Sequence, residues 1–123
     1  MKRAQLKKMT VDELVERFAE VGVAQGDAID NNENAKFNRL YEQMEQVDHE
    51  LRARGREARL ALMRLYDYPN MQVKLAAATY TLGVDPVSAR QMIQAIADSK
   101  WAPQALEAGM RIINLDNGTF VPD

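Results

Sequence analysis

The sequence predicts an all-α protein of about six helices, stacked as three antiparallel hairpins. Apolar residues recur at helical spacing in long runs, and clusters of β-branched residues are scarce. Glycine (6) and proline (4) are few, which argues against a linker-rich or disordered chain. A length of 123 residues is enough for one domain with its own core.

The first helix is expected to begin at Thr10-Val-Asp-Glu13, because a hydroxyl followed three residues later by glutamate is the pattern of a capping box. It should continue to about Ile29, and the polar residues 30–34 should connect it to a second helix over about 34–54. Both helices have one apolar face. The faces are Val11, Leu14, Val15, Phe18, Val21 and Gly22 in the first helix, and Phe37, Leu40, Met44, Val47 and Leu51 in the second.

Gly55 is expected to end the second helix, and a third helix should follow near 56–66. The turn Asp67–Asn70 separates it from a fourth helix that ends at Gly83, because the residue before a proline avoids helical conformation. The expected core positions are Ala58, Ala61, Leu62 and Leu65, followed by Val73, Ala76, Ala77 and Tyr80.

Asp85-Pro86 should begin the fifth helix, with aspartate as the cap and proline in the first turn. Pro103 should begin a sixth helix that reaches about Asn114. The expected packing positions are Ala89, Met92, Ile93 and Ile96, followed by Leu106, Gly109, Met110 and Ile113. The chain then divides into a basic N-terminal arm (1–9), a single helical domain (10–114) and a non-helical tail (115–123), in which Phe120 folds back onto the bundle.

Two of the predicted hairpins are similar to each other in sequence. Their first helices match at an offset of 31 residues, and their second helices match after one extra residue in the turn. The matching pairs are Ala58/Ala89, Leu62/Ile93, Leu65/Ile96 and Asp67/Asp98, then Val73/Ala105, Ala77/Gly109 and Tyr80/Ile112.

The first of these two hairpins preserves the repeat pattern better, and it resembles a known type of helical repeat. Asp67-Tyr-Pro-Asn70 followed by Val73-Lys74 and Ala77 is similar to a HEAT repeat, in which an aspartate turn leads to Val-Arg or Val-Lys at the start of the second helix. Lys74 stands where the repeat usually has arginine, and the second hairpin has no clear Val-Arg pair.

More narrowly, the chain resembles a small bacterial family of HEAT-like domains of unknown function. The residues that carry this resemblance are Leu51–Arg59, Leu62, Asp67–Asn70, Val73–Ala78 and Asp85-Pro86. The resemblance implies an α–α superhelix of the HEAT/armadillo type, and it brings no catalytic residues with it.

Charge is distributed unevenly along the chain. Residues 10–50 carry 11 acids against 3 cations, and residues 51–64 carry five arginines against one acid. The block Arg52–Arg64 could contact the phosphates of a nucleic acid, and this remains an alternative function. However, the acidic neighbouring helix would repel a duplex. We therefore expect these arginines to pair with Glu50, Glu57 and acids of the second helix, and we expect no nucleic-acid partner.

Few residues suggest a catalytic or metal-binding site. Without cysteine, disulfides and thiol catalysis are excluded. His49 is the single histidine, and Glu45 one turn earlier could share a metal with it. A helical two-metal site would need Glu-x-x-His motifs, whereas Gln46 precedes His49 by three residues. We therefore expect no catalytic residues, no cofactor and no metal, and a metal-dependent enzyme using Glu45 and His49 is the weaker alternative.

The expected function is non-enzymatic protein binding, with an immunity-like or a regulatory role both open. If the hairpins stack, their second helices line one surface. Its exposed candidate residues are Arg39, Gln43, Gln46, His49, Lys74, Thr81 and Arg111. The acidic first half is the other candidate surface and would suit a basic partner.

Three further expectations complete the prediction. No further repeat covers the apolar end faces of such a stack, so a homo-oligomer that covers them stays an open alternative. Tyr66, Tyr68 and Trp101 should cover the ends of the core, with an aromatic binding rim as the alternative. No apolar run follows the basic N-terminus, and no stretch is long enough for a membrane span, so we expect a cytoplasmic protein with no membrane contact.

Overall fold

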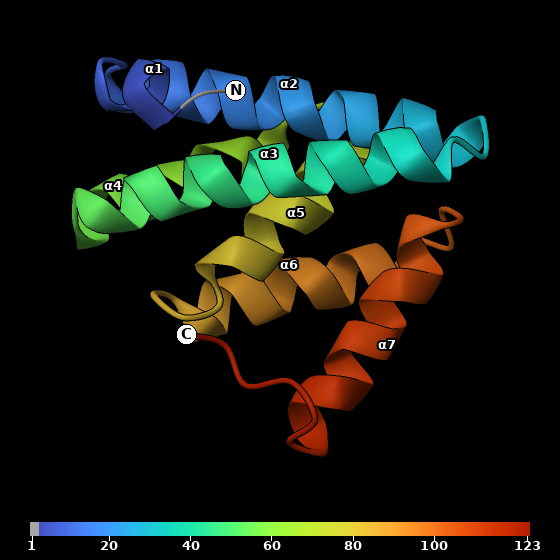
Figure 1. Ribbon diagram of the computed structural model, residues 1–123. Helices are drawn as coiled ribbons and strands as arrows, with labels where there is room; N and C mark the ends of the chain where they lie inside the picture. The colour runs from blue at the N-terminus through green and yellow to red at the C-terminus, as the bar shows by residue number, and fades with distance from the viewer. Residues whose placement is uncertain (1–2) are drawn as a thin grey trace.

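The computed structural model describes residues 3–123, and all regular elements in this range are helical (Figure 1). The predicted all-α class is therefore confirmed. In chain order the elements are α1 (Arg3–Lys7), α2 (Val11–Asp30), α3 (Asn34–Ala53), α4 (Arg56–Leu60), the 3-10 helix η1 (Ala61–Asp67), α5 (Met71–Thr81), α6 (Pro86–Asp98) and α7 (Gln104–Asp116).

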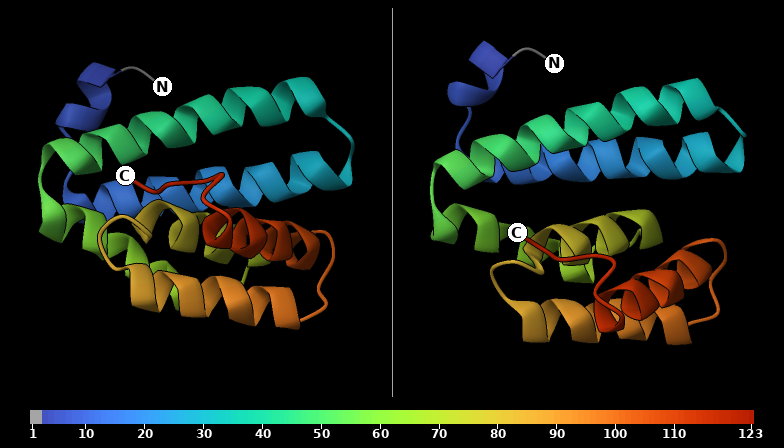
Figure 2. Two further views of the ribbon diagram at one scale, coloured as in Figure 1. Left: turned by 90° about the horizontal axis from the view of Figure 1, so that it is seen from below. Right: turned by 60° about the horizontal axis from the view of Figure 1, so that its bottom comes forward.

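The helices pack as consecutive antiparallel pairs. α2 lies against α3, η1 lies against α5, and α6 lies against α7 (Figures 1 and 2). α5 occupies the middle of the molecule, because it also contacts α2 on one side and α6 on the other. This arrangement explains why α5 carries the run of small residues Ala76–Ala78, all buried, which lets helices approach it closely.

The predicted helix starts are confirmed by their caps. The Glu13 backbone N–H donates to Thr10 Oγ1 (3.1 Å), and the Thr10 backbone N–H donates to Glu13 Oε1 (2.9 Å), which completes the capping box. Asn70 accepts from the backbone N–H of Val73, and Asp85 accepts from that of Ser88. Gly55 separates α3 from α4 with a φ of 105°, a conformation that favours glycine.

Three boundaries differ from the prediction. The third helix is α-helical only to Leu60 and continues as the 3-10 helix η1. α7 extends to Asp116, so the non-helical tail begins at residue 117 rather than 115. In the predicted basic arm, residues 1–2 lie outside the described range, while residues 3–7 form α1, whose Leu6 is buried.

The core consists of two apolar clusters that meet at α5. Val73, Ala76 and Ala77 belong to the first cluster, with α2, α3 and η1, whereas Leu75 and Ala78 belong to the second, with α6 and α7. The repeated positions occupy equivalent places: Ala58, Leu62 and Leu65 are buried in the first cluster, and Ala89, Ile93 and Ile96 in the second. Phe120 of the tail packs against the second cluster, as predicted.

The packing face predicted for α7 is wrong. Leu106, Met110 and Ile113 are 75%, 53% and 56% exposed, and Gly109 has open space where a Cβ would lie. The buried side instead has Gln104 and Ala108, with Ile112 and Leu115 packed beside the second cluster. Both stripes of α7 are apolar, and the last helix of a stack has a neighbour on only one side, so helical spacing alone selects the wrong stripe.

The three aromatic residues near the turns behave differently from one another. Tyr66 and Tyr68 pack against the first cluster and cover its edge, as expected. Trp101 is 62% exposed, so the expectation that it covers the core is wrong. None of the described helices combines the length and the apolar character required to cross a bilayer.

Candidate functional site

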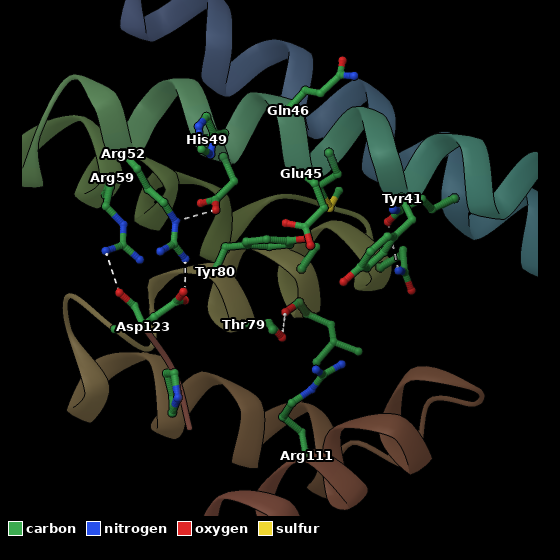
Figure 3. Close-up of a pocket in the computed structure, with 18 of the residues that line it drawn as sticks. Tyr41, Glu45, Gln46, His49, Arg52, Arg59, Thr79, Tyr80, Arg111 and Asp123 are labelled. Carbon is green, nitrogen blue, oxygen red and sulfur yellow. Dashed lines mark hydrogen bonds and ion pairs between the residues drawn. The ribbon is translucent and has the colours of Figure 1, made fainter. Parts of the chain in front are cut away.

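A cavity of about 690 Å³ opens between α3, α5 and α7 (Figure 3). These are the second helices of the three predicted hairpins, so the expectation that they line one surface is confirmed. Tyr41 and Glu45 enter the cavity from α3, Tyr80 from α5 and Arg111 from α7. The tail closes one end, where Pro122 and Asp123 line the wall.

The structure brings three of the seven candidate residues to this cavity. Gln46, His49 and Arg111 line it, whereas Arg39 and Gln43 lie elsewhere on α3. Lys74 lies beside a second, smaller hollow, together with Asp27 and Asp30 of α2 and with Trp101.

The expectation that Thr81 is exposed is wrong, because its side chain is completely buried. Its hydroxyl donates to the carbonyl of Ala77 at 2.8 Å and lies 2.6 Å from the hydroxyl of Tyr66. The cause is the central position of α5, which has helices on several sides and leaves little of its surface to solvent.

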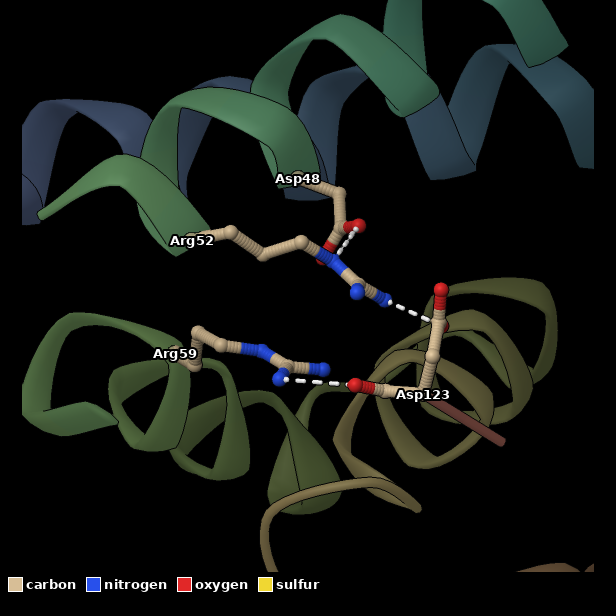
Figure 4. Close-up of polar contacts among 4 residues, drawn as sticks. All are labelled: Asp48, Arg52, Arg59 and Asp123. Carbon is tan, nitrogen blue, oxygen red and sulfur yellow. Dashed lines mark hydrogen bonds and ion pairs between the residues drawn. The ribbon is translucent and has the colours of Figure 1, made fainter. Parts of the chain in front are cut away.

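Four charged residues form a cluster at the tail end of the cavity (Figure 4). Arg52 Nε donates to Asp48 Oδ2 at 2.7 Å, and Arg52 Nη2 donates to Asp123 Oδ1 at 2.9 Å. Arg59 Nη1 donates to the main-chain oxygen of Asp123 at 3.3 Å. Asp48 is only 4% exposed, so this cluster extends from solvent into the interior.

The environment changes the proton affinity of these groups in opposite directions. Burial raises the pKa of Asp48, and this effect exceeds the opposing effect of Arg52. The hydrogen bond from Arg52 lowers the pKa of the more exposed Asp123. Burial, together with the neighbouring charge of Arg52, lowers the pKa of Arg59.

The cluster also contains unused hydrogen-bonding atoms. Among the described residues, neither Asp48 Oδ1 nor Arg59 Nε has a hydrogen-bond partner, although both atoms are buried. A buried polar atom without a partner costs about 1–3 kcal/mol. The contacts within the chain therefore leave part of the hydrogen-bonding capacity of this cluster unsatisfied.

The middle of the cavity is aromatic. Tyr80 packs edge-on against Phe18 of the core, with ring centroids 5.6 Å apart, and its ring points across the cavity toward Glu45 (Figure 3). Burial, with Glu45 and Tyr41 nearby, raises the pKa of Tyr80, so its hydroxyl remains protonated. The guanidinium of Arg111 lies 5.6 Å from the centroid of the Phe120 ring.

The arginine block is largely occupied by contacts within the chain. Arg54 pairs with Glu50 at 2.9 Å and donates to the carbonyl of Leu6, and Arg52 pairs with Asp48 of the second helix, as expected. The expected pairing with Glu57 is wrong, because within residues 3–123 no arginine of the block forms an ion pair with it. Arg64 instead meets Asp12 of α2. The contacts of Arg54 with Leu6 and of Arg64 with Asp12 join separate elements of the fold, which is a structural use of the block.

Glu45 and His49 both line the cavity. Within residues 3–123, however, no three side chains of His, Cys, Asp or Glu come close enough together to hold a metal ion. The arrangement at Glu45 and His49 therefore offers two ligands at most, fewer than the three protein ligands usual for catalytic zinc.

Several cavity residues were not recognised from the sequence as parts of a site. Asp48 precedes Arg52 by four residues, a spacing at which a helical ion pair forms, and this signal was available. Asp123 carried no such signal, because its approach to Arg52 and Arg59 depends on the path of the tail across the whole fold.

Comparisons with known proteins agree with this architecture. A crystal structure of the protein RPA1889 from Rhodopseudomonas palustris CGA009 is similar to the chain, with 50% sequence identity and a TM-score of 0.92. The similarity covers 96% of this chain and 98% of that one. No curated protein matches the sequence significantly.

The sequence profile of a protein family matches residues 12–116, from the second residue of α2 to the end of α7, and so covers every helix that lines the cavity. That family is described as "Domain of unknown function (DUF2019)". The match extends over most of the chain, and the chain therefore belongs to the DUF2019 family.

Proposed function

We propose that the protein is a non-enzymatic binding domain that holds a segment of another protein in the cavity between α3, α5 and α7. The observation that carries this proposal is the tail, because an extended segment of the chain itself already lies at one end of the cavity and is held there by Arg52 and Arg59. The same surface can hold a comparable segment from a partner.

The lining of the cavity supports a peptide ligand. Aromatic and arginine side chains are the residue types that contribute most to binding at protein interfaces. Here Tyr41, Tyr80 and Arg111 converge from three helices, and their positions are fixed by the helices rather than by loops. A volume of about 690 Å³ is within the range of ordinary ligand sites.

We also propose that the hairpins stack in the HEAT manner, as an α–α superhelix with the cavity on its concave side. The equivalent burial of Ala58 and Ala89, and of Leu62 and Ile93, supports a repeated unit. Such stacks commonly use their concave surface for binding.

Affinity capture from a bacterial lysate with a paired set of variants tests the function. We expect the double variant Tyr41→Ala/Arg111→Ala to lose a partner that the wild-type protein retains, because both side chains line the cavity. The control is Arg90→Ala/Trp101→Ala, which also removes one arginine and one aromatic residue, but outside the cavity.

Three results would argue against the cavity. If both variants retain the partner as well as the wild-type protein does, the cavity is excluded as the binding surface. Loss only in the control would indicate the aromatic rim at Trp101. In the third result, neutralising the exposed Glu16 and Glu20 of α2 abolishes capture of the partner, whereas the cavity variant still retains it. This result would favour the acidic first half as the binding surface and an immunity-like role toward a basic partner.

A further inference from the structure

The last residues of the tail make contacts that a separate peptide could reproduce. Phe120 packs against the second core cluster and anchors the tail, whereas Val121 is 77% exposed. Beyond it, Pro122 lines the cavity, and Asp123 places its side chain on Arg52 and its main-chain oxygen on Arg59 (Figure 4). The segment after Phe120 is therefore held mainly by polar contacts with two arginines.

Gly83 gives this segment the space that it requires. A Cβ built on Gly83 would lie 2.5 Å from the main-chain carbon of Asp123 and 3.0 Å from its oxygen. The φ of Gly83 is not in the left-handed region, so its backbone does not require glycine. The absence of a side chain instead lets a peptide backbone lie against the turn after α5.

The charges at this end of the cavity favour an acidic ligand. The charge of Arg52 lowers the pKa of Arg59, so the two guanidinium groups lie close together, and the single carboxylate of Asp48 balances only part of their charge. Like charges this close favour an added carboxylate, and arginine binds carboxylates with directed hydrogen bonds. Among the described residues, Arg59 Nε and Asp48 Oδ1 are buried and have no hydrogen-bond partner, so the contacts with the tail do not satisfy all polar atoms of this cluster.

We propose that the Arg52–Arg59 end of the cavity is a binding site for an extended acidic segment of a partner protein, and that tail residues 121–123 occupy it reversibly until that segment displaces them. This inference rests on the proposed function and adds the chemistry of the ligand: a carboxylate side chain for Arg52, a main-chain oxygen for Arg59 and a backbone that lies against Gly83.

A peptide titration of the full chain tests the proposal. The probe is the acetylated peptide Thr-Phe-Val-Pro-Asp, the sequence of residues 119–123, and the readout is the Nε–H signals of Arg52 and Arg59 in the NMR spectrum. An attached tail competes at an effective concentration in the millimolar range, so we expect Asp123→Asn to bind the peptide roughly tenfold more tightly than the wild-type protein.

Three controls make this titration specific. Asp12→Asn removes a carboxylate from another exposed ion pair, with Arg64, and should bind the peptide like the wild-type protein. A peptide with asparagine in place of aspartate should lose the binding. Gly83→Ala combined with Asp123→Asn should also lose it, because the new methyl group occupies the space of the peptide backbone.

Equal peptide affinity in the wild-type protein and in Asp123→Asn would overturn the reversible occupancy of the site by the tail. Shifts that avoid Arg52 and Arg59, or no shifts in either protein, would overturn the site itself. The outcome is separate from that of the capture experiment: a partner lost through Tyr41→Ala/Arg111→Ala would keep the proposed function even if the tail peptide does not bind.

Discussion

At the scale of single residues, the polar interior of this protein depends on three buried glutamines. Gln72 Nε2 donates to Gln25 Oε1 at 3.2 Å, and Gln104 Nε2 donates to Gln72 Oε1 at 3.1 Å. The chain of amides joins α2, α5 and α7, which belong to three different hairpins. Such a chain of hydrogen bonds helps to fix the relative positions of these helices, because its directed bonds are satisfied only in one arrangement.

Removing the middle glutamine should be costly. Gln72→Ala leaves the side-chain amides of Gln25 and Gln104 without their shared partner, and a buried polar group left unpaired costs about 1–3 kcal/mol. We expect the free energy of unfolding to fall by roughly 2–4 kcal/mol in urea denaturation. Gln91→Ala, on the exposed side of α6, should change it by less than about 0.5 kcal/mol. Similar values for both variants would show that the chain of amides is unimportant.

Asp48 should make stability depend on pH in a defined direction. Its pKa is raised in the folded protein, so its contribution is most favourable below the ordinary value of 3.8 and is lost as the pH rises through the folded pKa. Asp48→Asn should remove this loss. We therefore expect the melting temperature of the variant, relative to the wild-type protein, to be higher at pH 7 than at pH 3.5. A difference that is equal at both pH values would contradict the assignment.

The sequence identified few of these residues as important. Glutamines are common on helix surfaces, and nothing next to Gln25, Gln72 or Gln104 marks them as buried. One signal was present, because Gln72 and Gln104 stand at the same offset as Val73 and Ala105 in the second helices of the repeat. Long-range contacts such as that of Asp123 with Arg52 carry no local signal.

At the scale of whole elements, local chemistry predicted where helices begin but not which side of each helix is buried. The caps at Thr10, Asn70 and Asp85 involve atoms within three residues, so the pattern defines them almost completely. The exposed stripe of α7 depends instead on which neighbour exists. The 3-10 geometry of η1 likewise lacked a signal in the helical pattern.

The close contact of α2 with α5 gives a prediction at this scale. A Cβ on Gly22 would lie 2.8 Å from Val73 Cγ2, so Gly22→Ala should force the two helices apart and cost about 1–3 kcal/mol. Gly109→Ala, within α7, meets nothing within 4 Å and should stabilise the protein by up to about 1 kcal/mol. Urea denaturation of both variants measures the difference. Equal effects at the two glycines would contradict the close packing of α2 and α5.

At the scale of the whole molecule, the consecutive pairing of helices places α3, α5 and α7 around one cavity and brings the tail back to it. The sequence repeat predicted this common surface, because equivalent helices of stacked hairpins face the same way. It did not predict the occupied end of the cavity. The exposed stripe of Leu106, Met110 and Ile113 provides the apolar end face that was expected, and a homo-oligomer stays a prediction.

The most direct measurement of the central claim is an NMR comparison of the labelled full chain, alone and with the partner that the wild-type protein captures. We predict that the largest shifts occur at cavity residues from three helices, including Tyr41 of α3, Tyr80 of α5 and Arg111 of α7. Shifts confined to the exposed acidic residues of α2, with Tyr41, Tyr80 and Arg111 unchanged, would contradict the assignment of the cavity as the binding surface.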